Sequence, residues 1–263
     1  MIDSRIPIVH SFPNNDHIKI YFSSDMHVGH RNFDEKQWHD FEKLLQEPDT
    51  YVIFAGDQME YATPRSRSSM YETVMHPREV KQWWIDHLKP YAKDKLLCLV
   101  DGNHEWNRAS READAYPLYD IAYKLDIEER YRSEAAFVDV GVGRVTHGGN
   151  LGKTFRYIFR VCHKATNQVK FGTADAFDGI DIFVAGHTHQ PLDKPLGKMV
   201  YSQQKKCVYK KTVENFVCGS FLTYGGYAER DGMRPPAEKT WSVELCGTKK
   251  RIITHGFRID EMV

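Results

Sequence analysis

Thirteen histidines occur in the 263-residue chain, and several lie beside aspartate or asparagine in short motifs. Histidine is the commonest metal ligand and the usual general acid or base near neutral pH. Asp-x-His and Gly-Asp are common by chance, whereas Gly-Asn-His-Glu is rare. The occurrence of all the motifs in one order therefore indicates a functional site more strongly than any single motif does. In chain order its five members are Asp25-x-His27, Gly56-Asp57, Gly102-Asn103-His104-Glu105, a histidine at 147 or 163, and Gly186-His187-x-His189.

These residue types suit a pair of divalent cations. Two ions held about 3.5–4 Å apart can clamp both the attacking and the leaving oxygen of a phosphoryl transfer. Such a pair needs one bridging carboxylate, and Asp57 is suited to that role. Oxygen and imidazole ligands favour Mn, Fe, Zn, Ni or Mg over Cu(I) or iron–sulfur clusters. The glycines at 56, 102 and 186 let the backbone approach the ions without a Cβ clash.

Most of the motifs directly follow a predicted strand. In the N-terminal half, short apolar runs alternate with helical periodicity, which predicts a sheet with helices packed on it. Ligands of open α/β sheets bind at the carboxyl ends of the strands. The predicted strands are 18–22, 51–55 and 95–100, and the predicted helices are 34–46 with Asp34 as N-cap, 76–91, and 105–125 broken or kinked at Pro117.

The second half is richer in strands, and the helical signal is weak after about residue 195. We expect a second sheet packed on the first, in a layered sandwich with outer helices. The predicted strands are 135–140, 144–146, 155–162, 180–184, 206–211, 215–218, 240–246 and 251–257.

Composition excludes several classes of protein. Apolar residues make up 41% and charged residues 27%, which is typical of a globular domain rather than a disordered chain. Lys+Arg and Asp+Glu both number 36, so the chain is not a generic polyanion binder. The five cysteines form no Cys-x-x-Cys pair, which argues against disulfides and thiolate zinc sites. With no secretory signal and no apolar run long enough for a membrane, we expect a cytoplasmic protein.

The ordered motifs resemble those of the calcineurin-like metallophosphoesterases, whose series is D-x-H, G-D, G-N-H-[DE], H and G-H-x-H. The resemblance spans roughly residues 18–225 and is closest to the compact bacterial and phage type. It implies a four-layer α/β/β/α sandwich of two packed mixed sheets flanked by helices. One domain would then cover 1–263, with the motifs in 18–225 and a strand-rich completion in 226–263.

The resemblance also implies roles for individual residues. Asp57 would be a ligand of both ions, and a hydroxide bridging the ions would attack phosphorus. His104 would contact the substrate beside Asn103 and protonate the leaving oxygen. One ion would be held by Asp25, His27, Asp57 and His189, and the other by Asp57, Asn103, His187 and one further histidine.

Two histidines compete for the fourth motif. His147 lies in Thr146-His-Gly-Gly149, which resembles the family's His-Gly turn. His163 follows a longer strand-like run, but Lys164 stands where glycine is usual, and a cation beside the metals is unfavourable. We therefore expect His147 to be the ligand and keep His163 as the alternative.

The expected activity is hydrolysis of a phosphomonoester or phosphodiester, with manganese as a suitable assay metal. Arg31 and Arg108 are candidates for binding a phosphate oxygen, against the alternative of helix-face salt bridges. The basic run Lys205–Lys211 favours a solvated β-hairpin, and contact with nucleic acid is possible but not favoured. A nuclease acting on DNA or RNA is the first alternative. A non-catalytic scaffold is the second, disfavoured because His104 is present and no ligand type is missing.

Overall fold

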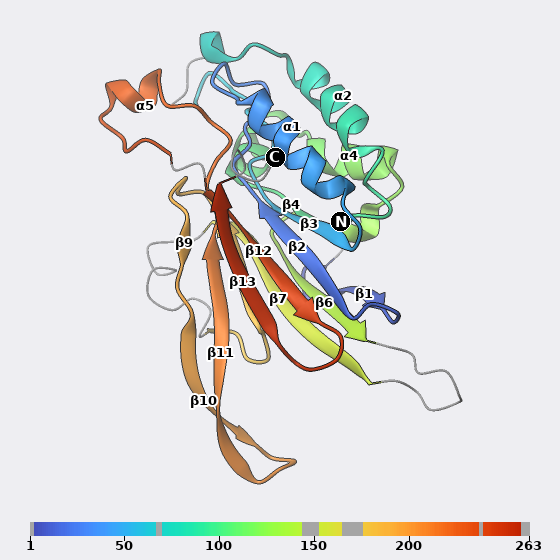
Figure 1. Ribbon diagram of the computed structural model, residues 1–263. Helices are drawn as coiled ribbons and strands as arrows, with labels where there is room; N and C mark the ends of the chain where they lie inside the picture. Colours follow the sequence, from blue (N-terminus) through green and yellow to red (C-terminus); the bar gives the residue numbers. More distant parts are fainter. Residues whose placement is uncertain (1–2, 67–69, 144–152, 165–175, 237–238, 259–263) are drawn as a thin grey trace.

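The computed structural model describes residues 3–66, 70–143, 153–164, 176–236 and 239–258, and two β-sheets face each other in it (Figure 1). The six-stranded sheet has the order β13-β12-β2-β3-β4-β5. Strands β2 to β5 are parallel, and β12 and β13 extend the sheet in antiparallel fashion. The bounds are β2 (His17–Ser23), β3 (Thr50–Ala55), β4 (Leu96–Val100), β5 (Tyr131–Arg132), β12 (Lys239–Cys246) and β13 (Ile252–Arg258).

The seven-stranded sheet has the order β1-β6-β7-β8-β11-β10, and β9 also pairs with β11. Its central strands β7, β8 and β11 are parallel, whereas β6 and β10 run antiparallel to their neighbours β7 and β11. The bounds are β1 (Ile8–Phe12), β6 (Ala135–Gly143), β7 (Thr154–Lys164), β8 (Ile182–Gly186), β9 (Leu192–Asp193), β10 (Leu196–Ser202) and β11 (Cys207–Val217).

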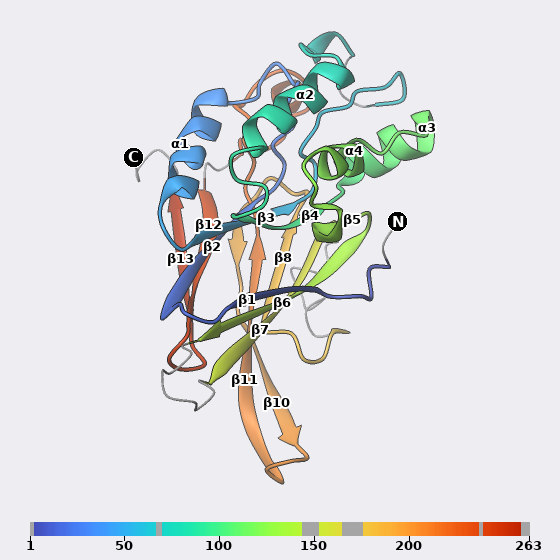
Figure 2. The same ribbon diagram turned by 90° about the vertical axis from the view of Figure 1, so that its right-hand side faces the viewer.

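Three amphipathic helices cover the outer face of the six-stranded sheet: α1 (Glu35–Gln46), α2 (Pro77–Leu88) and α4 (Pro117–Lys124) (Figures 1 and 2). As predicted, Asp34 caps α1, because its side chain accepts a hydrogen bond from the Gln37 N–H. Trp38 and Trp84 on these helices are buried against the sheet. The short helical segments are Met70–Glu72, His104–Ser110 in π geometry, α3 (Arg111–Ala113), Glu128–Arg130 and α5 (Tyr227–Arg230).

A second apolar layer lies between the two sheets. Successive residues of a strand face opposite sides, so Tyr21 packs under the helices while Phe22 packs between the sheets against Phe159 and Phe216. All four rings are fully buried. Burying one large apolar side chain stabilises a fold by about 1.5–3 kcal/mol. This packed sandwich fixes where each strand ends, and therefore where the motifs lie.

The two mixed sheets flanked by helices confirm the predicted fold class. The strands predicted at 206–211 and 215–218 form one strand, β11, and neither β10 nor β1 was predicted. The helix predicted over 105–125 is interrupted after Ala113, where Asp114 takes a left-handed conformation (φ 47°). Pro117 then begins α4, a position that tolerates its missing N–H. The predicted strand 144–146 lies outside the described residues, and within the described ones no helix is long and apolar enough to cross a membrane.

Candidate metal centre

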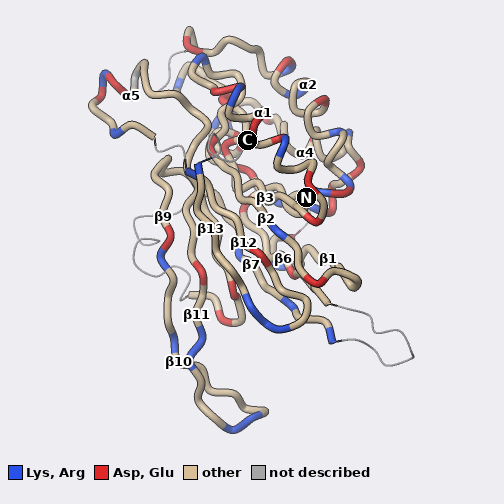
Figure 3. Tube along the Cα trace, in the orientation of Figure 1, with Lys and Arg blue, Asp and Glu red and all other residues tan. Residues whose placement is uncertain are grey.

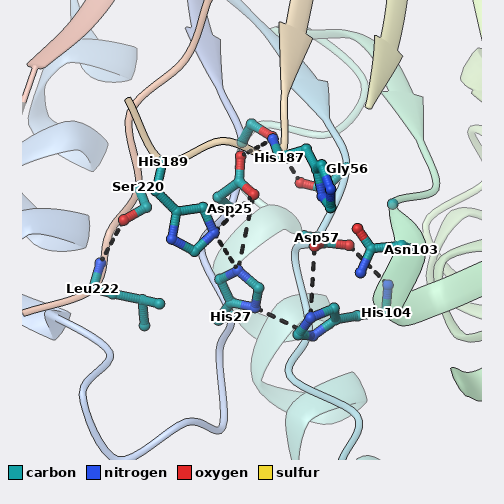
Figure 4. A network of polar contacts seen from close by, with 12 residues as sticks. Asp25, His27, Gly56, Asp57, Asn103, His104, His187, His189, Ser220 and Leu222 are labelled. Carbon is teal, nitrogen blue, oxygen red and sulfur yellow. Dashed lines mark hydrogen bonds and ion pairs between the residues drawn. The ribbon is translucent and has the colours of Figure 1, made fainter. Parts of the chain in front are cut away.

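Loops from both sheets converge at one end of the sandwich (Figure 4). Asp25 and Asp57 lie two residues beyond the ends of β2 and β3, Asn103 lies beyond β4, and His187 directly follows β8. The loops after β2 and β3 remain bonded to each other, because the N–H groups of Asp25 and His27 donate to the carbonyls of Gly56 and Asp57 at 3.0 Å. Residues from distant parts of the chain thus share one neighbourhood.

Five candidate ligands have left-handed backbone conformations, which non-glycine residues rarely adopt. A residue held in a sparsely populated backbone region costs about 1–3 kcal/mol, and such residues cluster at functional sites. Here the bends turn the side chains of each loop toward the centre instead of letting them alternate as in a strand. The φ angles are 53° for Asp25, 51° for His27, 51° for Asp57, 76° for His187 and 54° for His189.

One group of potential ligands consists of Asp25, His27 and His189, whose ligand atoms lie within 4.8 Å of one another. Asp25 Oδ1 lies 3.2 Å from His189 Nε2 and 3.9 Å from His27 Nε2. Asp25 Oδ2 accepts a hydrogen bond from the His187 N–H at 2.8 Å, whereas the buried Oδ1 accepts none within the described residues. A buried carboxylate oxygen flanked by two imidazole nitrogens fits a divalent cation.

A second group consists of Asp57, His163 and His187. His163 Nε2 lies 3.1 Å from Asp57 Oδ2 and 3.2 Å from Asn103 Oδ1. His163 Nδ1 lies 2.9 Å from the Ala55 carbonyl, so an Nδ1–H donated there leaves Nε2 to face the acidic groups. Fixing a metal-binding imidazole through its other nitrogen is typical of metal sites. The donor set is again oxygen and nitrogen, without thiolate.

His147, the expected fourth-motif ligand, lies outside the described residues, whereas His163, the alternative, lies within them and beside Asp57. Side chains of β7 alternate between its two faces, and His163 continues the buried face of Tyr157, Phe159 and Val161. As a result His163 is 3% exposed and lies among the acidic groups, whereas the Lys164 side chain is exposed. This alternation removes the objection that the neighbouring lysine raised.

Asp57 connects the two groups, and His104 lies beside it. The His104 N–H donates to Asp57 Oδ1 at 2.8 Å, and His104 Nε2 lies 3.7 Å from Asp57 Oδ2. His104 Nδ1 lies 3.2 Å from His27 Nδ1. Together, His27, Asp57 and His104 form a third group of potential ligands. The fold therefore places His104 directly beside Asp57 and His27.

Sequence reasoning missed Glu60, which supports two of these histidines. Glu60 is 2% exposed, and its Oε2 lies 3.2 Å from His27 Nδ1 and 3.4 Å from His104 Nδ1. Arg108 donates to the Glu60 carbonyl at 2.9 Å and to Oε1 at 2.8 Å. Arg108 thus forms an ion pair with Glu60, a buried loop carboxylate rather than a partner on its own helix face. The only sequence signal for Glu60 is an acidic residue three positions after Asp57.

Glu105, the last residue of its motif, is fully buried and ties two loops together. Its Oε2 accepts hydrogen bonds from the N–H groups of Asp57 at 3.1 Å and Gly102 at 2.8 Å, and its Oε1 accepts one from Met59 at 2.9 Å. Burial, and then the nearby charge of Asp57, raise the pKa of Glu105 to about 7. The carboxyl group therefore holds the backbone that positions the bridging candidate.

The electrostatic balance keeps the two central aspartates ionised. Burial alone opposes ionisation, but the neighbouring histidines outweigh it and lower the pKa of both Asp25 and Asp57. Burial also opposes the charge of His163, yet Asp57 and Asp25 raise its pKa to about 10. Burial dominates at His104, where it lowers the pKa to about 3. Anionic carboxylates among imidazoles are what a cation requires.

The glycines of the motifs are needed because the site is tightly packed. A Cβ on Gly186 would lie 2.5 Å from Asp25 Oδ2, and one on Gly56 would lie 2.6 Å from the His163 Cβ. A Cβ on Gly102 would collide with the Asp57 carboxylate. The sequence analysis expected these glycines to make room for the ions. In the structure they make room for the side chains of the candidate ligands Asp25, Asp57 and His163.

Two cavities adjoin the cluster, and Asn103 lines both. The larger, of about 440 Å³, contains His27, Asp57 and His189 and extends past His30, Asn32, Tyr224, Met233 and Arg234. The other, of about 380 Å³, contains His163 and extends past Trp106, Ser133 and Glu134. Arg31 and Arg108 line neither of these two cavities. His30, only 4% exposed, has an Nε2 without a hydrogen bond within the described residues.

Comparison with solved structures finds distant neighbours, and the three described next have TM-scores below 0.5. One is a predicted phosphoesterase from Streptococcus pneumoniae (13% identity, TM-score 0.39, covering 93% of this chain and 91% of that one). Another is GAP50, described as the anchor in the inner membrane complex of Plasmodium (11%, 0.46, 94% and 86%). A third is an NAD nucleotidase from Haemophilus influenzae (10%, 0.38, 91% and 50%).

Among curated proteins, no sequence matches the chain. The sequence profile of the calcineurin-like phosphoesterases, in contrast, matches residues 18–191. That span contains Asp25, Asp57, Asn103, His163 and His189, and it ends just beyond the last motif. Since the match covers well over half of the 263 residues, the chain belongs to the calcineurin-like phosphoesterase family.

Proposed function

We propose that the protein is a phosphoesterase that works with two divalent metal ions. The observation that carries the proposal is the pair of adjacent ligand groups, one of which contains Asp57, at the ends of strands from both sheets. The groups approach each other closely, since His163 Nε2 of the second lies 4.0 Å from Asp25 Oδ1 of the first. Asp25, His27, Asp57 and His189 would hold one ion, and Asp57, Asn103, His163 and His187 the other.

When bound, the ions would polarise the phosphoryl oxygens and lower the pKa of a coordinated water that provides the attacking oxygen. The chain itself orients the ester. Asn103 lies between the two cavities, and His104 faces the same centre with its Nδ1 2.7 Å from the Glu60 carbonyl. Burial favours the neutral ring of His104 without substrate, so its role as proton donor requires the phosphate charge to raise its pKa.

The two cavities support a finer assignment of the substrate. A phosphomonoester carries an organic group on one oxygen, whereas a diester carries one on each of two. Spaces of about 440 and 380 Å³ meet at Asn103 on different sides of the cluster. We expect the centre to accept phosphodiesters as well as monoesters.

Hydrolysis of p-nitrophenyl phosphate and bis(p-nitrophenyl) phosphate with Mn²⁺ tests the proposal, with metal content measured on the same sample. Turnover should fall by at least about 10³-fold in Asp57→Asn, since the bridging carboxylate is lost. Protein that holds two metal ions and turns over neither ester would overturn the proposal in favour of a non-catalytic scaffold. Repeating the assay with Fe, Zn, Ni and Mg identifies the productive ion.

We also propose a cytoplasmic location. All five cysteines are free thiols, as a reducing compartment maintains them. Fractionation of cells that express the native chain tests this.

A further inference from the structure

The β10–β11 hairpin extends beyond the seven-stranded sheet. Strand β11 pairs with β8 only over Glu214–Val217, whereas Cys207–Val213 pair with β10 alone. Residues 196–213 therefore form a two-stranded ribbon, here called the arm, which projects away from the rest of the molecule (Figures 1 and 2). The eleven residues of β11 span about 36 Å, so the tip of the arm lies at the opposite end of the sheet from the metal centre.

The arm is cationic although the whole chain has no net charge. It carries Lys198, Lys205, Lys206, Lys210 and Lys211, and no acidic residue occurs between 196 and 211. The turn between β12 and β13 adds Lys249, Lys250 and Arg251. Figure 3 shows these positive charges along the arm and in the neighbouring turn. Lys198 and Lys211 lie on one face of the ribbon and Lys210 on the other, and such a local cluster of basic residues is the electrostatic sign of a polyanion site.

The arm and the turn enclose a cavity of about 650 Å³ at the base of the arm. One of its two acidic residues, Asp181, is held between Lys211 at 3.0 Å and Lys250 at 2.6 Å. No carboxylate of the described residues forms an ion pair with Lys210 or Arg251. The cavity therefore keeps a positive balance; its charged lining residues are Arg156, Asp181, Lys210, Lys211, Glu214, Lys250 and Arg251.

Exposed apolar side chains lie among the lysines of the arm. Met199, Tyr201 and Val208 are 68%, 60% and 59% exposed, and Tyr201 is paired with Val208 across the ribbon. Tyr209, 45% exposed, lines the cavity. Aromatic rings beside cations are the usual combination for single-stranded nucleic acid, since bases stack on the rings while lysines follow the phosphates.

We propose that the arm and the cavity at its base bind single-stranded nucleic acid. A second copy of the chain fits this surface less well, because the lysines of two arms would face each other. The proposal goes beyond ester hydrolysis and is independent of the metals, since the arm lies far from the candidate ligands. Its partner is recognised by backbone charge and stacking, without base-specific hydrogen bonds.

Binding of fluorescein-labelled 20-nucleotide oligo(dT) and oligo(U) by the full chain tests the proposal. Asp57→Asn serves as the background, so that any nuclease activity does not consume the probe. We expect affinity to fall as salt rises, with a slope of about −0.7 for each phosphate contacted. Lys205→Glu/Lys206→Glu/Lys210→Glu should weaken binding by at least about tenfold and make the salt slope shallower. Tyr201→Ala/Tyr209→Ala should weaken it by about tenfold with the slope unchanged.

The matched control is Lys89→Glu/Lys93→Glu/Lys124→Glu, which makes the same charge change with exposed lysines at the helical face. Equal losses in the arm and control variants, or no binding at 50 mM salt, would overturn the proposal. So would an arm-dependent dimer in light scattering, or tighter binding of a polyglutamate peptide than of oligo(dT). When the arm substitutions are made in the wild-type chain, with Asp57 intact, hydrolysis of aryl phosphates should be unchanged. This result separates the test of the arm from that of the metal centre.

Discussion

The two ends of strand β11 contrast in how the chain uses charged residues. Past its C-terminal end, Ser220 is 3% exposed, and the neighbouring loops bury the carboxylates and imidazoles of the metal centre on left-handed backbone. At its N-terminal end the turn residue Lys206 is also left-handed (φ 50°), but Lys205, Lys206, Lys210 and Tyr209 are exposed rather than buried. Buried charge needs fixed partners, because leaving it unpaired is costly. Exposed charge needs only to be concentrated, so the metal end should be far less tolerant of substitution than the arm.

The largest effect that distinguishes the two ends should come from His163→Ala. It removes an imidazole 3.1 Å from Asp57 Oδ2, so the variant should bind one metal ion fewer and lose at least about 100-fold in turnover. The measurement is metal content per chain with aryl phosphate hydrolysis. His147→Ala is the control and should keep both ions. Loss of an ion in His147→Ala, with none in His163→Ala, would assign the ligand to His147 instead.

A matched pair of glycines sharpens the comparison. In Gly186→Ala the new methyl group meets Asp25 and Ser24, so unfolding free energy should fall by about 1–3 kcal/mol and metal affinity should drop. In Gly197→Ala on the arm, the nearest atom is the end of Lys210 at 3.4 Å, so stability should change by less than about 0.5 kcal/mol. Urea unfolding measures both. Equal effects at the two glycines would show that the metal end is no more tightly packed than the arm.

Glu105→Gln should weaken the metal end without removing a ligand. An amide has one acceptor oxygen for three backbone N–H groups, so stability should fall by about 1–3 kcal/mol. The raised pKa of Glu105 means that the folded protein holds its proton more tightly than the unfolded chain. The contribution of Glu105 to wild-type stability therefore falls as pH rises from about 4.5 to about 7, and this loss is absent from the variant. In EDTA, thermal unfolding should show the gap between the two proteins narrowing over that range; a constant gap would contradict the raised pKa.

Sequence patterns predict the parts of the molecule that depend on local chemistry. Asp34 caps α1 because its side chain bonds a residue three positions away, and Asp57 was found because it follows a strand at a glycine. Glu60 depends on tertiary structure instead, because it meets two histidines from other loops. The alternation of β7 points His163 inward, but only the packing of the two sheets brings it beside Asp57. The arm was predicted only as a basic hairpin, since the cavity at its base requires Arg156 and Lys250 from elsewhere in the chain.

The smallest effect is expected at the tip of the arm. Lys205 and Lys206 are exposed in the turn between β10 and β11, about 36 Å along the strand from the metal centre. At physiological salt, charges separated by more than about 8 Å in solvent are largely screened. Lys205→Glu/Lys206→Glu should therefore change unfolding free energy by less than about 0.5 kcal/mol and aryl phosphate turnover by less than about twofold. If turnover falls further while metal content is constant, the arm communicates with the centre, and the two ends of β11 are not independent.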